Sequence, residues 1–79
     1  MRVKVIPKGL VKRECFKNLE KKFLVFEIED KISVEDFLKI LNVPKGYVSV
    51  ISINRKRADM KTIILNNDTI SLWPPVAGG

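Results

Sequence analysis

Residues 33–42 read SVEDFLKILN and carry the pattern of an amphipathic helix. Ser33 is a suitable N-cap, and Asp36 stands three residues later, which makes an approximate capping box. Apolar residues recur at the i, i+3, i+4 and i+7 spacing that places them on one helical face: Val34, Phe37, Leu38 and Leu41. The helix should end by Asn42, because Pro44 disfavours helical geometry at the residue before it.

Segments with strand patterns lie on both sides of this helix. Residues 2–6 alternate polar and apolar side chains with period two. Residues 23–29 are a second strand, in which Leu24, Phe26 and Ile28 share one face and the alternate residues share the other. Residues 47–53 are rich in β-branched side chains, residues 61–65 are compatible with a short strand, and residues 69–72 form a last strand. The order of strand, strand, helix, strand, short strand and strand predicts an α+β roll of the β-grasp type. In such a roll, one main helix lies across a mixed sheet of four to five strands.

The connections between these elements carry breaking and turn residues. Residues 7–9, which read PKG, end the first strand. Residues 10–22 fit either a short helix or the arms of an extended hairpin, and both interpretations stay open. The basic residues 55–57 indicate an exposed turn. Residues 66–68 have turn chemistry, since asparagine tolerates left-handed backbone geometry better than most residues.

The composition describes one small domain of 79 residues and 9.0 kDa. It contains no histidine, which excludes Ser-His and Cys-His catalysis and histidine-ligated metal sites. The single cysteine, Cys15, excludes an intramolecular disulfide and a multi-cysteine zinc site. We interpret Cys15 as a small hydrophobe that is at least half-buried, with a role in sulfur relay as the alternative. Self-contained hydrolytic or metal chemistry is therefore not expected, and no metal site is predicted.

The sequence shows neither a targeting segment nor a membrane span. Its longest apolar runs are a few residues, far short of the ~20 that cross a bilayer. An unpaired cysteine is compatible with a reducing compartment. We therefore expect a cytoplasmic protein without a membrane partner.

Positive charge is concentrated in residues 1–22. That segment holds eight basic residues against Glu14 and Glu20, which accounts for the whole net charge of +6. A docking face for an acidic partner or for nucleic acid is one interpretation. We favour an ordinary solvated surface, because the segment lacks the interleaved aromatic residues of a base-stacking platform. Nucleic acid is therefore not the expected partner.

The last seven residues, 73–79, read WPPVAGG and support neither a helix nor an internal strand. Pro74 and Pro75 lack backbone donors and favour a stiff extended conformation. Gly78 and Gly79 have no side chains, so their backbone can enter a narrow slot. We therefore predict a β-grasp domain over residues 1–73 and an extended tail over 74–79 that can reach about 20 Å. A frayed terminus or an expression remnant is the alternative, but neither explains why prolines and glycines directly follow a core strand.

The stretch Ile51–Gly79 carries a family resemblance. With its Asn-Asp turn, final strand and terminal PPVAGG, it resembles the MoaD/ThiS sulfur-carrier family of ubiquitin-like β-grasp proteins. Within that family it is most similar to MoaD, the small subunit of molybdopterin synthase. Residues 7–22 follow no pattern that aligns with the family. The family usually has glycine where Asn67 stands, and asparagine can adopt the same backbone geometry.

The resemblance implies a carrier on which other enzymes act. An activating enzyme similar to those that activate ubiquitin would use ATP to adenylate the carboxylate of Gly79, and a sulfur donor would convert it to a thiocarboxylate. A partner such as the large subunit of molybdopterin synthase would then take the sulfur. The chain would be a protein cosubstrate rather than an enzyme, with no bound cofactor. Gly79 would be the covalent site, and the threading segment would consist of Pro74, Pro75, Val76, Ala77 and Gly78.

Trp73, at the base of the tail, has two interpretations. It could cap the sheet edge as ordinary core, or it could anchor a partner interface, where tryptophan is enriched. The sequence does not favour one over the other.

Several acceptors and functions stay open beside the preferred one. The Pro-Pro element favours molybdopterin synthesis, for a molybdenum or tungsten cofactor, over thiazole and thiamine synthesis. Transfer of sulfur to tRNA or in amino-acid biosynthesis, and conjugation to protein lysines as a ubiquitin-like modifier, are further alternatives. A different class is an RNA-binding β-grasp module with a basic first segment, and a third is an interaction domain without covalent chemistry.

Overall fold

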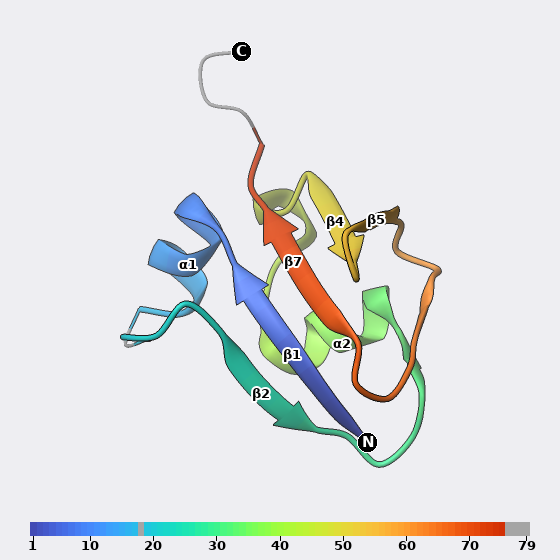
Figure 1. Cartoon of the computed structure of the whole chain (residues 1–79). Coiled ribbons are helices and arrows are strands. Elements are labelled where there is room, and N and C mark those ends of the chain that lie inside the picture. The colour runs from blue at the N-terminus through green and yellow to red at the C-terminus, as the bar shows by residue number, and fades with distance from the viewer. Residues whose placement is uncertain (18, 76–79) are drawn as a thin grey trace.

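The computed structural model describes residues 1–17 and 19–75 (Figure 1). Its seven strands, two α-helices and one 3-10 helix form an α+β molecule whose main sheet is crossed by helices. In chain order the elements are β1 (Arg2–Pro7), α1 (Gly9–Cys15), β2 (Leu24–Glu27), β3 (Ile32–Ser33), α2 (Val34–Leu41), η1 (Lys45–Tyr47), β4 (Val50–Ile53), β5 (Lys56–Ala58), β6 (Ile63–Ile64) and β7 (Thr69–Trp73).

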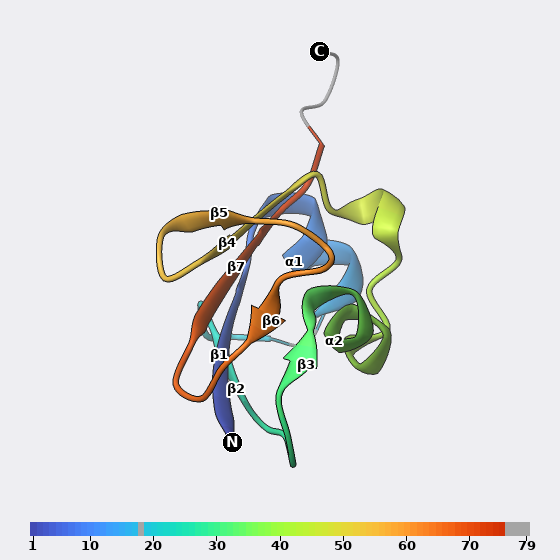
Figure 2. The same cartoon turned by 90° about the vertical axis from the view of Figure 1, so that its right-hand side faces the viewer.

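The main sheet has five strands in the order β2-β1-β7-β4-β5, so β7 lies at its centre. β1 and β7 run parallel, while β1 with β2, β4 with β7 and β4 with β5 run antiparallel. β3 and β6 form a separate two-stranded sheet beside α2 (Figure 2). The predicted mixed sheet of a ubiquitin-like β-grasp roll is therefore confirmed.

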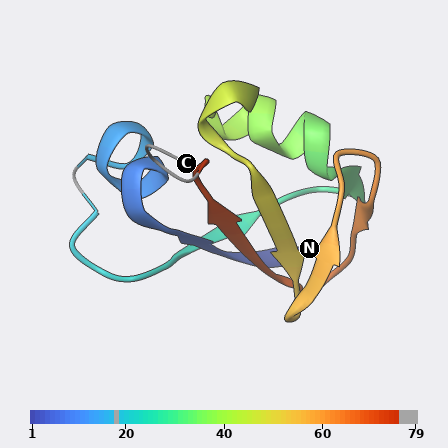
Figure 3. The ribbon, with the colours of Figure 1, turned by 90° about the horizontal axis from the view of Figure 1, so that it is seen from above.

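One face of the main sheet carries the helices and the core, and the other face is open (Figure 3). Val3 and Val5 of β1 and Ile70 and Leu72 of β7 are buried on the covered face, because successive strand residues alternate between faces. They pack against the apolar stripe of α2, where the ring of Phe37 meets Phe26 edge-on at a centroid distance of 5.9 Å. The open face holds the alternate residues of each strand.

The predicted helix is confirmed in its position, its buried face and its ends. Ser33 is the N-cap, and its hydroxyl oxygen accepts a hydrogen bond of 3.2 Å from the backbone nitrogen of Asp36. Val34, Phe37, Leu38 and Leu41 are all buried. Asn42 ends the helix with a left-handed backbone at a φ of 59°, a geometry that asparagine accepts more readily than most residues.

The structure decides one open expectation about the first half of the chain and shortens another. Part of residues 10–22, left open between helix and hairpin, forms α1, which begins at Gly9 and buries Val11 against the sheet. The second strand is shorter than expected and spans only Leu24–Glu27 of residues 23–29.

Two expectations about the second half were wrong in part. The predicted strand over 47–53 begins only at Val50, because Tyr47 belongs to η1. The predicted turn over 55–57 lies one position earlier, at Asn54 and Arg55, and Lys56–Ala58 form β5 instead. Asn54 and Arg55 both have positive φ, of 53° and 71°, as a tight two-residue hairpin turn requires. The turn at 66–68 is confirmed, with Asn67 at a φ of 69°.

Candidate functional site

The candidate site is the end of β7, where the chain leaves the centre of the main sheet (Figure 1). Ile70 and Leu72 are 1% and 0% exposed and fix the strand in the core. Trp73 is the last strand residue and pairs with Val50 of β4. The tail therefore begins from the most constrained strand of the fold.

Backbone hydrogen bonds hold β7 on both sides up to its last residue. On the β1 side, the backbone nitrogen of Lys8 donates to the carbonyl oxygen of Leu72 at 2.9 Å. On the β4 side, the backbone nitrogen of Ser49 donates to the carbonyl oxygen of Trp73 at 2.8 Å. The last two residues of β7 before Pro74 are thus both hydrogen-bonded to neighbouring segments, and the sheet sets the direction in which the chain leaves.

Pro74 rests on the first residue of α1. Gly9 has a φ of +48°, and a Cβ built on it would lie 3.3 Å from Cγ of Pro74. A side chain at that position would meet both a strained backbone and the proline ring. Pro74 is half-buried, whereas Pro75 is exposed. The base of the predicted tail is therefore supported by α1 as well as by β7.

Trp73 projects from the open face, opposite to Ile70 and Leu72. Its side chain is 38% exposed, so it is not part of the buried core. The ammonium group of Lys8 lies 5.9 Å from the centroid of its ring, within the range of a cation-π contact. The first interpretation of Trp73, as ordinary core, is not supported, and its role as a partner anchor stays a prediction.

The same open face is basic and polar below Trp73. A shallow hollow of about 460 Å³ lies there, and it is lined by Lys4, Ile6, Asn54, Arg55, Thr69 and Ser71. The two cations in this lining give the open face a positive character that suits an acidic surface on a partner.

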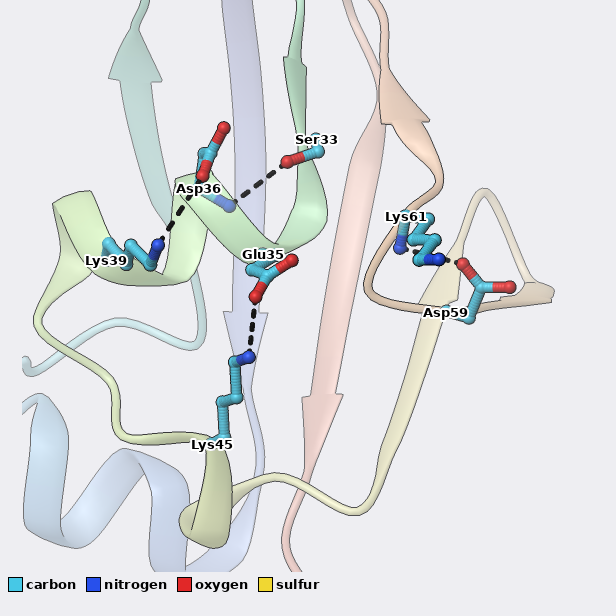
Figure 4. A network of polar contacts seen from close by, with 7 residues as sticks. All are labelled: Ser33, Glu35, Asp36, Lys39, Lys45, Asp59 and Lys61. Carbon is cyan, nitrogen blue, oxygen red and sulfur yellow. Dashed lines mark hydrogen bonds and ion pairs between the residues drawn. The ribbon is translucent and has the colours of Figure 1, made fainter.

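An ion pair ties η1, which precedes β4, to the start of α2 (Figure 4). Nζ of Lys45 lies 2.6 Å from Oε1 of Glu35. This hydrogen bond lowers the pKa of Glu35 below its ordinary value, and the positive charge of Lys45 lowers it further. Ser49 follows η1 and its backbone nitrogen donates to Trp73, so the Lys45–Glu35 ion pair supports the β4 side of the end of β7 indirectly.

Two features of the described residues bear on metal and thiol chemistry. No cluster of three cysteine, aspartate or glutamate residues with metal-binding geometry occurs within residues 1–17 and 19–75. Burial, followed by the nearby charge of Glu14, raises the pKa of the half-buried Cys15 thiol, which reduces its thiolate fraction. Cys15 is therefore poorly suited to relay sulfur.

The predicted site residues lie partly within the described structure. Trp73, Pro74 and Pro75 are described, and they are placed together at the end of β7. The predicted threading residues 76–78 and the predicted covalent site Gly79 lie outside the described residues. The division into 1–73 and 74–79 stays a prediction. In the part of the chain that the structure describes, no helix is long and apolar enough to cross a bilayer.

Three supporting residues were not singled out from the sequence: Lys8, Gly9 and Ser49. Each contributes a backbone contact, to which Lys8 adds its side chain on Trp73, and each contacts a residue that lies 24 to 65 positions away in the chain. Gly9 had one visible signal, because a glycine after Pro7 and Lys8 marks a position where a special backbone geometry is useful. The hydrogen bonds from Lys8 and Ser49 have no counterpart in the sequence pattern.

Comparison with protein-family models and with curated protein sequences gives no match. Among solved structures, the chain is similar to SAMP1 from Haloferax volcanii, with a TM-score of 0.74 and 13% identity over 100% of both chains. It is similar to a putative molybdopterin converting factor, subunit 1, from Pyrococcus furiosus, with a TM-score of 0.71 and 17% identity over 96% of this chain and 99% of that one.

A third similarity is to a chain in the complex of subunits 1 and 2 of the molybdopterin-converting factor from Helicobacter pylori. It has a TM-score of 0.60 and 25% identity over 100% of both chains. The chain has a MoaD/ThiS-like β-grasp fold.

Proposed function

We propose that this chain is a ubiquitin-like sulfur carrier whose Gly79 carries an adenylate and then a thiocarboxylate. The observation that carries the proposal is the end of β7, which is central in the sheet and hydrogen-bonded on both sides up to Trp73. It places Pro74 and Pro75 directly after a rigid strand. A segment whose base is already ordered loses less entropy when it enters a partner enzyme.

The chemistry needs two steps at the carboxylate of Gly79. A carboxylate oxygen attacks the α-phosphorus of ATP, and pyrophosphate leaves. Hydrosulfide, or a persulfide sulfur followed by a thiol reductant, then attacks the acyl carbon and displaces AMP. The product is a thiocarboxylate with one oxygen replaced by sulfur. Two glycines at the end of the segment leave the acyl carbon open to attack from several sides.

The catalytic groups for both steps belong to partners in this proposal. The described residues provide neither a metal cluster nor an activated thiol, as the raised pKa of Cys15 indicates. In this proposal the chain is a cosubstrate, and we place it in the cytoplasm. ATP binds to an activating adenylyltransferase rather than to this chain.

The preferred acceptor is an enzyme of molybdopterin synthesis. The Pro-Pro element favours it, and two similar structures are described as molybdopterin-converting factor proteins. The Helicobacter pylori structure is a complex of subunits 1 and 2, which supports a partner of the subunit 2 type that receives the sulfur. The basic open face around Lys4 and Arg55 suits an acidic docking surface on such a partner.

The test is intact-mass analysis after incubation with the cognate activating enzyme, ATP and a sulfide donor. We expect a product in which one oxygen atom of the chain is replaced by sulfur, and tandem fragmentation should place that sulfur on Gly79. A matched control is the same chain extended by one alanine after Gly79. It should keep its fold but yield no product, because the extension replaces the glycine terminus at which the enzyme acts.

Two results would contradict the carrier proposal. One is an unchanged mass of this chain under these conditions, when a separate assay shows that the activating enzyme is active. The other is equal sulfur loading of the extended control. If loading succeeds, adding purified molybdopterin synthase large subunit with its pterin substrate then tests the acceptor, because a molybdopterin carrier should lose its sulfur in that reaction.

A further inference from the structure

The two edges of the main sheet are protected very differently. The β5 edge carries three consecutive basic residues, Arg55, Lys56 and Arg57, and charged residues on an edge discourage pairing with another strand. The β2 edge instead presents the uncharged stretch 23–26, which reads FLVF. Val25 is 51% exposed there, and no described strand pairs with the outer side of β2 (Figure 1). The β2 edge is therefore free to add a strand.

Hydrogen bonding inside the sheet determines which backbone groups of β2 point outward. The terminal amine of Met1 donates a hydrogen bond of 2.7 Å to the carbonyl oxygen of Ile28. The backbone nitrogen of Ile28 donates one of 2.7 Å to the carbonyl oxygen of Met1. Bonding direction alternates along an antiparallel strand, so every second residue from Ile28 faces β1. The groups on the free edge therefore belong to Phe23, Val25 and Glu27.

Charges around this free edge are arranged with opposite signs about Val25. Lys21 and Lys22 precede the uncharged stretch, and Glu27 and Glu29 follow it. Lys21 and Glu29 lie in the bends that flank β2, each four residues from Val25, so a copy of the segment turned end for end brings the lysine end of one copy to the glutamate end of the other. The segment is electrostatically complementary to itself in the antiparallel direction.

We propose that two copies of this chain pair through their β2 edges, antiparallel, with Val25 opposite Val25 on the twofold axis. In this register the outward groups of Phe23 of one copy meet those of Glu27 of the other, and Val25 bonds to its counterpart. The bend that holds Lys21 in each copy then lies beside the bend that holds Glu29 in the other. Pairing joins the two five-stranded sheets into one continuous sheet.

This pairing leaves the candidate site accessible. β7 is separated from the β2 edge by β1, so neither end of β7 lies at the new contact. The antiparallel twofold directs the two β7 strands toward opposite ends of the joined sheet. The proposal is therefore compatible with a carrier function, and it does not depend on one.

The first test measures molar mass by sedimentation equilibrium, over roughly 10 µM to 1 mM, where an interface of this small size would associate. We expect a reversible shift from one chain of 9.0 kDa toward two. Val25→Lys should leave the folded monomer intact, since the side chain is 51% exposed, and should abolish the dimer by placing two lysines together on the axis. Ile63→Lys, at a residue 50% exposed in β6, is the matched control and should dimerise normally.

The second test uses charge reversal and identifies the register. Lys21→Glu and Glu29→Lys should each raise the dissociation constant about fivefold or more, because each places like charges together at two symmetric positions. The combined variant should recover the original affinity, since the pairs re-form with exchanged signs. The two single variants change the net charge of +6 in opposite directions, so a general charge effect would not weaken both.

Three outcomes would overturn the proposal. The first is a monomer at every concentration in that range. The second is a dimer that Val25→Lys weakens no more than Ile63→Lys does, which would place the contact elsewhere. The third is a combined charge-reversal variant that binds no better than either single variant, which would reject the register with Val25 on the axis.

Discussion

Gly9 shows at the scale of one residue how the base of the tail is held. Its φ of +48° lies in the left-handed region, which costs an L-residue with a side chain about 1–2 kcal/mol. The absence of a Cβ also lets the ring of Pro74 approach the first turn of α1. One residue therefore satisfies two demands, a backbone geometry and a close contact.

We predict that Gly9→Ala lowers the free energy of unfolding by about 1–2 kcal/mol, because it adds backbone strain and crowds Pro74. Thermal or urea unfolding measures the change. Gly46→Ala is the matched control, since a Cβ at Gly46 would meet nothing within 4 Å, and it should be neutral or slightly stabilising. Equal losses in both variants would show that the environment of Gly9 is not special.

The sequence alone supports the prediction of a tail over 74–79, because proline and glycine restrict or release the backbone wherever they stand, and the tail stays a prediction. The contact between Gly9 and Pro74 was not, because it joins residues 65 positions apart and depends on how β1 and β7 align. The exposure of Trp73 was likewise undecided until the strand's faces were known.

At the scale of elements, α2 and η1 act together on the β4 side of the candidate site. Lys45 of η1 binds Glu35 in the first turn of α2, where a negative charge also suits the helix dipole. The pKa of Glu35 is lowered chiefly by the hydrogen bond from Lys45 and then by its charge. The contribution of this carboxylate to stability is thus present above its ordinary pKa and is lost as pH falls through the lowered value.

The Lys45→Met variant should therefore have a lower free energy of unfolding than the original protein at neutral pH. The difference between the two proteins should become smaller as the solution becomes acidic. The difference in urea midpoint between the two proteins, followed from neutral pH to below the ordinary Glu pKa of 4.5, measures this. Lys31→Met, at a lysine that does not contribute to the pKa of Glu35, should show no such pH-dependent difference. A constant difference across the whole range would mean that Glu35 does not sense Lys45.

Elements with strong periodicity were predictable, and elements made by pairing were not. The i, i+3, i+4, i+7 stripe located α2 to the residue, and alternation located β1 and β7 to within one residue at their ends. β5 consists of Lys56, Arg57 and Ala58, which favour strands poorly, and it exists because the turn at Asn54 and Arg55 folds it onto β4. A strand of this kind depends on its partner rather than on its own composition.

At the scale of the whole molecule, stability and the proposed function occupy different parts of the chain. All the buried hydrophobic residues of the described structure lie between Val3 and Leu72, and the open face and tail base add little to that core. The core of the described residues therefore lies entirely ahead of the predicted tail.

Deletion of residues 76–79 should leave the thermal unfolding temperature unchanged while abolishing sulfur loading. Calorimetry and the intact-mass assay check the two halves of this prediction. The same variant separates the carrier from an RNA-binding module, because the eight basic residues of segment 1–22 remain in place. Tight RNA binding that survives the deletion, together with no loading of the full chain, would favour the RNA-binding interpretation instead.

The central position of β7 also bears on how the molecule is made. On the ribosome, β1, β2, β4 and β5 all emerge before β7, the last described strand to be synthesised and the one that joins β1 to β4. Because β1 has no other link to β4 within the main sheet, a nascent chain cannot complete that sheet until β7 has been synthesised. An activating enzyme that recognises the finished sheet would therefore find that surface only on chains in which β7 has already been made.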